Sequence, residues 1–207
     1  MRLIGNWSKP IDAVKHKLLC SKVALRQSGC CAFCGYKSPI TSTFPTGNME
    51  VCLTREGLAI EESNAIALCG VCHHFNSFDS LLVEGKPLGM FVELPYFTQG
   101  ELVNLQRILY CIAMSKNEKV TNHPLYHASS ALIKNLTKIP DDWQKNDFDG
   151  SVSTLKHAVE HYTGHVKPVE GKVLYVDRLR FSFNPQYFKS HLEYWLPQIE
   201  SQLMAGD

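Results

Sequence analysis

Four of the eight cysteines in this chain form two pairs with the same spacing. Cys31 and Cys34 enclose Ala-Phe, and Cys69 and Cys72 enclose Gly-Val. Two residues between thiolates allow one tight turn to present both sulfurs to the same metal ion. Two such turns complete the tetrahedral Cys₄ set that is typical of structural zinc. The sequence therefore predicts one structural Zn²⁺ held by these four cysteines.

Other uses of these cysteines are open from the sequence. Unpaired cysteines are common in protein cores. A CxxC pair can also be a redox site, although neither pair stands in an evident βαβ unit. Cys30 is an alternative ligand, but it forms a CxxxC spacing with Cys34, so Cys31 is favoured. Gly35 follows the first pair, where a positive φ helps backbone N–H groups to point at the sulfurs.

Local patterns predict the elements that position the two pairs. Residues 11–27 are expected to form a helix, which Ser28-Gly29 ends just before the first pair. Residues 49–54 alternate in polarity as a strand does, and a helix is expected to open near Cys69. The positions of the first helix expected to lie on one apolar face are Ile11, Val14, Leu18 and Leu25.

The middle of the chain predicts a strand followed by a long helix. Residues 88–94 form a short apolar run. Thr98-Gln-Gly-Glu101 matches a capping box, in which Thr98 serves the backbone at the helix start and Glu101 reaches back. The apolar stripe expected to face the core on this helix is Leu102, Leu105, Leu109 and Ile112.

A second region is expected after residue 115, so that an N-terminal domain covers 1–115 and a mainly helical region covers 116–207 and packs on it. Asn184 is expected to cap the last helix, with Pro185 at its first position. The elements expected in this region are helices over 125–136, 152–162 and 185–203, and a strand or hairpin over 172–176 and 178–183. Its aromatic residues, expected mainly in the core and alternatively on a partner surface, are Tyr175, Phe181, Phe183, Tyr187 and Trp195.

Composition limits the class of protein. The 207 residues carry 21 Lys+Arg against 20 Asp+Glu, and this net charge of +1 argues against a protein that mainly coats nucleic acid or anionic membrane. Charge is uneven, because the first 40 residues hold seven Lys/Arg and one Asp. No apolar run approaches the ~18 residues of a membrane span. A cytoplasmic location is expected, where thiols stay reduced and cysteines more often bind metal.

The zinc pairs and their surroundings resemble the zinc-bearing branch of the HNH nucleases. Asn64 stands five residues before the second pair, and His73 directly follows it, as in that family. The resemblance implies an α+β fold with a treble-clef ββα zinc unit and flanking helices. The family's general base is a histidine at the end of the first hairpin strand, yet this chain has Val51-Cys52 there and no histidine between the pairs. Asn64 and His73 are therefore predicted to be vestigial positions, with no catalytic residue.

A closer resemblance covers residues 11–115. Cys31-Ala-Phe-Cys34-Gly-Tyr and the stretch from Glu93 to Ala113 are similar to the DotN/IcmJ family, zinc-binding subunits of the coupling complex of Dot/Icm (type IVB) secretion systems. The resemblance implies a non-catalytic adaptor that binds the cytoplasmic C-terminal tail of a DotL-like coupling ATPase and contacts other coupling-complex subunits. It also implies a place at the inner membrane through that complex. The tail-binding surface is unknown from sequence.

Three alternatives stay open at this point. An active HNH-type nuclease would use His73 or His74 in an altered metal site. A zinc-containing DNA-binding module would show steep salt dependence. The third alternative is a second metal site formed by three histidines at positions 157, 161 and 165. Their spacing would place them on one face of a helix, but the glutamate of the metalloprotease motif is absent.

Overall fold

The computed structural model is a mixed α+β protein with small antiparallel sheets. The structure describes residues 13–53, 61–74, 82–83, 86–138, 150–151 and 179–205. The predictions over 152–162 and 172–176, and for Tyr175, lie outside these residues. The described elements in chain order are α1 (Ala13–Arg26), β1 (Met49–Leu53), the 3₁₀ helix η1 (Glu62–Asn64), β2 (Ala65–Cys69), α2 (Gly70–His74), β3 (Leu82–Val83), β4 (Lys86–Pro87), β5 (Gly89–Glu93), α3 (Gln99–Met114), α4 (Glu118–Thr121), α5 (Pro124–Leu136), β6 (Leu179–Phe183) and α8 (Lys189–Ala205).

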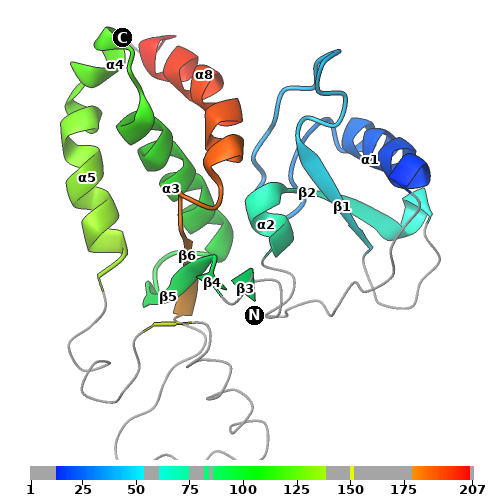
Figure 1. The fold of residues 1–207 in the computed structure, drawn as a ribbon, viewed down its shortest axis with the longest axis horizontal. Coiled ribbons are helices and arrows are strands. Elements are labelled where there is room, and N and C mark those ends of the chain that lie inside the picture. The colour runs from blue at the N-terminus through cyan, green and yellow to red at the C-terminus, as the bar shows by residue number, and fades with distance from the viewer. Residues whose placement is uncertain are drawn as a thin grey trace, which may run out of the picture.

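The N-terminal elements form one group around a β-hairpin. Strands β1 and β2 pair antiparallel, with Met49 opposite Cys69 and Leu53 opposite Ala65. Helix α1 packs on this hairpin, and α2 follows β2 directly (Figure 1). The predicted strand is confirmed over Met49–Leu53, which pairs with β2 along its whole length and is buried at every residue except Glu50.

The face that α1 turns to the core differs from the predicted one. Leu18 and Leu25 are 60% and 61% exposed, so the expected stripe through them was wrong. The helix instead buries a neighbouring stripe, which consists of Leu19, Cys20, Val23 and Ala24. This set repeats at i, i+1, i+4 and i+5, a helix face as regular as the one predicted. The hairpin therefore selects between two apolar faces of comparable periodicity.

Helix α3 begins as the capping box predicts. The backbone N–H of Glu101 donates to Thr98 Oγ1 at 3.2 Å, and the Thr98 N–H donates to Glu101 Oε2 at 2.7 Å. Leu102, Leu109 and Ile112 are buried as expected, whereas Leu105 is only half-buried. The helix is buried on more than one stripe, because α5, α8 and β6 all pack against it.

A second small sheet joins segments from the two predicted regions. Strand β5 pairs antiparallel with β6, with Gly89 opposite Phe183 and Glu93 opposite Leu179. Figure 1 shows this sheet beneath α3 and α8, in the group of elements drawn from green to orange. The two predicted regions thus share a sheet, and the division at residue 115 stays a prediction.

Two buried glutamines of α3 cover the other edge of β6. Gln99 Nε2 donates to the Phe181 carbonyl at 2.8 Å, and the Phe181 N–H donates back to Gln99 Oε1 at 2.7 Å. Gln106 Oε1 accepts from the Phe183 N–H at 3.4 Å, and its Nε2 donates to the Ser182 side-chain hydroxyl at 2.6 Å. An amide side chain has the same donor and acceptor as a peptide group, so these contacts act as a substitute strand. They close an edge that would otherwise present unpaired backbone groups.

Replacing Gln99 with leucine is expected to destabilise the protein by about 1–3 kcal/mol, because buried backbone groups lose their hydrogen bonds. The free energy of unfolding in urea measures the change. Gln202→Leu, on an exposed position of α8, is the matched control and is expected to change stability by less than about 0.5 kcal/mol. Equal effects of the two substitutions would contradict the role given to Gln99.

The C-terminal helix starts later than predicted. Residues 185–188 form a turn, and the helix opens at Lys189 instead of Pro185. Asn184 caps this turn, since its Oδ1 accepts from the Gln186 N–H at 3.0 Å. The delay allows Phe188 to enter the core, where its ring packs edge-on against Phe183 at 5.4 Å.

The aromatic residues of the second region are mostly core. Phe181, Phe183 and Trp195 are buried, and Tyr187 is partly exposed. The alternative that these residues form a partner surface is therefore wrong for the three buried rings. The start of the second region contains a further short helix, α4, which was not predicted and packs against α8. In the described part of the chain, every helix is too short or too polar to cross a bilayer.

Candidate metal centre

The first cysteine pair lies on a loop fixed by the end of α1. Ser28 and Gly29 take positive φ values of 54° and 71°, which turn the chain back after the helix. A Cβ on Gly29 would lie 2.5 Å from the Ser38 carbonyl oxygen, so only glycine fits there. The predicted end of the helix at this dipeptide is thus confirmed.

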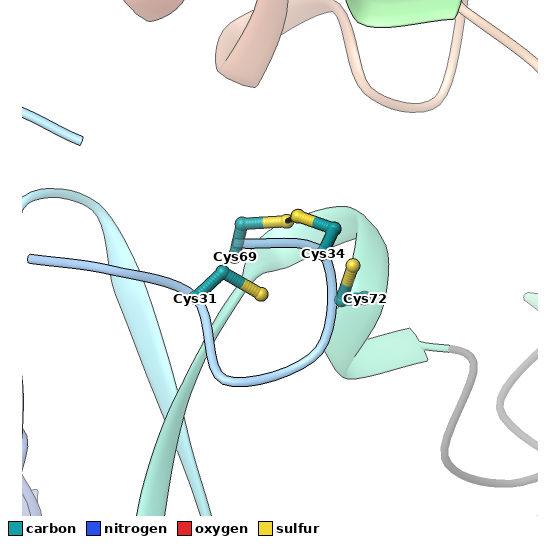
Figure 2. Close-up of side chains that lie close together, drawn as sticks. All are labelled: Cys31, Cys34, Cys69 and Cys72. Carbon is teal, nitrogen blue, oxygen red and sulfur yellow. Dashed lines mark hydrogen bonds between the residues drawn. The ribbon is translucent and has the colours of Figure 1, made fainter. Parts of the chain in front are cut away.

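The loop itself is a tight knuckle. The Cys31 N–H donates to the Tyr36 carbonyl at 2.9 Å, and the Gly35 N–H donates to the Cys31 carbonyl at 2.9 Å. Gly35 has φ of 71°, as the sequence predicted for the residue after the first pair. This turn brings Cys31 and Cys34 to the same side of the loop (Figure 2).

The second pair sits where strand changes to helix. Cys69 is the last residue of β2, and Cys72 lies in α2. The Ala32 N–H of the first knuckle donates to the Ala67 carbonyl of β2 at 3.0 Å. The side chain of Gln27 bonds the same strand, with its Oε1 accepting from the Ala67 N–H at 2.8 Å. These bonds hold the first knuckle beside the end of the hairpin, next to the second.

The four predicted ligands come together in one cluster. The Sγ atoms of Cys31, Cys34, Cys69 and Cys72 all lie within 4.8 Å of one another, and Figure 2 shows the side chains converging. The Cys34 and Cys69 sulfurs are 3.9 Å apart. A disulfide would need about 2.05 Å, whereas sulfurs around a tetrahedral zinc with ~2.3 Å bonds lie about 3.8 Å apart. The cluster fits a metal ion better than a disulfide.

Cys30, the alternative ligand, lies outside this cluster. Its Sγ is 4.0 Å from the Ser28 carbonyl oxygen, and its backbone forms an isolated bridge with Lys37. The bridge fixes Cys30 in an extended conformation beside the loop, so its successor Cys31 enters the knuckle. The spacing argument that favoured Cys31 thus agrees with the positions of the sulfurs.

Sequence reasoning missed the arginine that touches this cluster. Arg107 of α3 is 1% exposed, and its Nη2 lies 3.2 Å from Cys69 Sγ and 3.7 Å from Cys34 Sγ. Its Nη1 donates to Asn104 Oδ1 at 2.5 Å, and Asn104 Nδ2 donates to the Cys34 carbonyl at 2.7 Å. The sequence shows only a single arginine in an apolar helix, three residues after Asn104 and seven after Gly100, and this pattern does not by itself indicate burial.

Two aromatic rings enclose the same guanidinium. Its Cζ lies 3.8 Å from the Tyr36 ring centroid and 4.3 Å from that of Trp195. The two rings also meet edge-on at 5.6 Å. Tyr36 donates its hydroxyl to Gln198 Oε1 at 2.5 Å. The C-terminal helix therefore covers the cysteine cluster through Trp195 and Gln198.

The cysteine thiols and the Arg107 guanidinium shift one another's pKa values. Hydrogen bonding from Cys31, then from Cys69 and Cys72, lowers the pKa of the Cys34 thiol well below its usual range, and Arg107 adds to this. Burial alone would lower the pKa of Arg107, but the charges of Cys69 and Cys34 outweigh it and hold that pKa above its usual value. Hydrogen bonds with Cys31 and Cys34, together with burial, raise the pKa values of Cys69 and Cys72 well above the usual one. Cys34 is therefore favoured to become a thiolate, the form of cysteine that binds metal.

The positions compared with the HNH family lie around the same unit. Asn64 ends η1, and His73 and His74 are partly buried on α2. Cys52, which the sequence resemblance aligns with the base of that family, is buried in β1 opposite Ile66. The roles predicted for Asn64 and His73 stay predictions. The three spaced histidines at 157, 161 and 165 lie outside the described residues.

Comparison with known proteins assigns no family. No protein-family model matches the chain, and a search of curated proteins finds no significant match. The features of this chain that bear on its function are therefore the cysteine cluster and the residues around it.

Proposed function

We propose that the four cysteines bind one Zn²⁺ as a closed structural centre, and that the protein acts as a non-catalytic adaptor. The observation that carries this proposal is the convergence of four cysteine sulfurs, three of them from buried residues. Catalytic zinc sites keep one position open for water or substrate, whereas four protein sulfurs fill the coordination shell. When bound, such an ion would supply cross-linking of the two knuckles.

We also propose that the first knuckle, the β1–β2 hairpin and α2 form a treble-clef unit of HNH type. The order of first knuckle, β1–β2 hairpin and α2 carrying the last ligand supports it. The same comparison argues against nuclease activity, because Cys52 occupies the position of the general base. Losing a general base typically costs about 10²–10⁴ in rate. We therefore propose the fold without the family's chemistry.

The adaptor role is proposed from the resemblance to the DotN/IcmJ subunits. The Cys31-to-Tyr36 motif and the capped start of α3 carry that resemblance. In the structure these two segments lie against each other, because Asn104 and Arg107 of α3 bond Cys34. The proposed partner is the C-terminal tail of a DotL-like coupling ATPase, with other coupling-complex subunits. The proposed location is the cytoplasm, at the inner membrane through that complex.

Native affinity purification from the source cells tests this role. A coupling ATPase recovered in near-equal amount, with one zinc per chain by elemental analysis, is the expected result. Recovery of nucleic acid without the ATPase would overturn the adaptor proposal. DNA nicking with added Mg²⁺ or Mn²⁺ that disappears in His73→Ala would favour the HNH-type nuclease instead.

A further inference from the structure

A buried cation with sulfur neighbours is the most unusual feature of the described residues. Arg107 is almost fully buried, and arginine is rarely buried without a paired anion. Burying an unpaired charge is strongly unfavourable. In the described part of the chain, the hydrogen-bond partners of the guanidinium are the sulfurs of Cys69 and Cys34 and the uncharged amide oxygen of Asn104. The cysteine cluster is therefore the group that can supply the counter-charge of Arg107, once its sulfurs are thiolates.

The charge balance of the cluster needs such a cation. Four thiolates around one divalent ion carry a net charge of about −2, and this charge lies among buried residues. The guanidinium reduces the total to about −1. Hydrogen bonds from N–H donors to metal-bound sulfur also withdraw electron density from the thiolate, as other outer contacts tune metal ligands. Nη2 is placed to donate to two of the four sulfurs.

The position of the guanidinium is fixed from several sides. Asn104 accepts from Nη1 and bonds the backbone of Cys34, so it ties the arginine to the first knuckle. Gly100 lies one turn before Asn104 on α3 and allows the helix to approach the first knuckle closely, because a Cβ there would lie 3.2 Å from Cys34 Cα. Tyr36 and Trp195 enclose the planar group. A planar cation stacked on two rings is a role that lysine does not reproduce.

We propose that Arg107 is a working part of the metal centre: it donates hydrogen bonds to the ligand sulfurs and offsets their charge. This raises the affinity for metal and suppresses the reactivity of the thiolates toward electrophiles. The inference rests on the proposed metal centre and goes beyond it, because it assigns a tuning residue that is not a ligand. Arg107 acts here as a positioning and charge-balancing residue.

The test compares Arg107→Met with the wild-type full chain, each loaded with zinc. Competition with a chromophoric chelator measures the zinc dissociation constant, and we expect it to rise about 10- to 100-fold in the variant. Iodoacetamide alkylation of the zinc-loaded protein is expected to be faster by a similar factor. In the Co²⁺-substituted protein, the sulfur-to-cobalt charge-transfer band is expected to move to lower energy, a readout that a purely structural loss does not shift.

Arg26→Met is the matched control. Arg26 bonds the carbonyls of Glu62 and Ala65 at the base of the hairpin and does not contact the sulfurs. It is expected to leave the band position and the alkylation rate unchanged. Arg107→Lys keeps the charge without the planar fork, and we expect a band and an affinity between those of wild type and Arg107→Met. If Arg107→Met does not fold, the band position and zinc affinity of Arg107→Lys test the role of Arg107 instead.

The outcomes separate the two proposals. Wild-type protein that binds no metal would defeat the proposed zinc centre and this inference together. Wild-type protein that binds one zinc, with an unchanged band, affinity and alkylation rate in the folded Arg107 variants, would overturn the role of Arg107 alone.

Discussion

Replacing Cys69 with serine is expected to abolish stoichiometric metal binding and to unfold the elements around the hairpin. Cys69 is buried at the end of β2 and contributes one of four clustered sulfurs. A structural zinc contributes on the order of 10 kcal/mol to folding, which is as large as the whole stability of a typical domain, about 5–15 kcal/mol. Zinc content by elemental analysis and far-ultraviolet circular dichroism measure the two losses.

Cys30→Ser is the matched control for this substitution. Cys30 neighbours a ligand in sequence, but its sulfur lies outside the cluster. It is expected to keep one zinc per chain and an unchanged spectrum. A strong chelator added to the wild-type protein should reproduce the spectrum of Cys69→Ser. If Cys69→Ser instead retained both zinc and helical signal, the four-cysteine centre would be refuted.

Patterns that act over a few residues could be predicted from the sequence. The CxxC spacing correctly predicted that the four sulfurs lie together, because each knuckle is a local turn that this spacing determines. The capping box at Thr98 fixed the start of α3 for the same reason, since both partners lie within one turn. The hairpin strand at Met49–Leu53 followed from alternation of polarity.

Features that depend on distant parts of the chain could not be predicted in this way. Helix α1 offers two apolar faces, and only the position of the hairpin decides that Leu19 and Val23 are buried while Leu18 is exposed. The start of α8 moved from Pro185 to Lys189 because Phe188 enters the core next to Phe183. In both cases tertiary packing outweighed a local preference.

The role of Arg107 is the clearest case of this limit. Apart from Asn104, its contacts come from residues between 38 and 88 positions away in either direction, which include Cys69, Tyr36 and Trp195. A helical arginine is usually exposed, and no local pattern indicates otherwise. The four clustered cysteines thus come from two local turns, whereas the residues around them come from distant parts of the chain. The C-terminal helix supplies one wall of those surroundings, through Trp195.

Replacing Trp195 with alanine is expected to destabilise the whole described core by about 3–5 kcal/mol, the usual cost of truncating a buried tryptophan or phenylalanine. Trp195 is 1% exposed and stacks on the Arg107 guanidinium, and its ring centroid lies 5.8 Å from that of His191. Its loss opens a cavity between α8 and the first knuckle and removes one side of the enclosure around Arg107. Urea denaturation followed by circular dichroism measures the free energy of unfolding.

The effect should reach the metal centre, since cluster and helix share one buried cation. We expect zinc to bind Trp195→Ala more weakly than wild type, although no ligand is changed. Trp195→Phe retains a ring and is expected to recover part of both losses. Tyr187→Ala, which removes a partly exposed ring from the turn before α8, is expected to change stability by less than about 1 kcal/mol. A stability loss below about 1 kcal/mol in Trp195→Ala, together with wild-type zinc affinity, would show that α8 and the cysteine cluster are energetically independent.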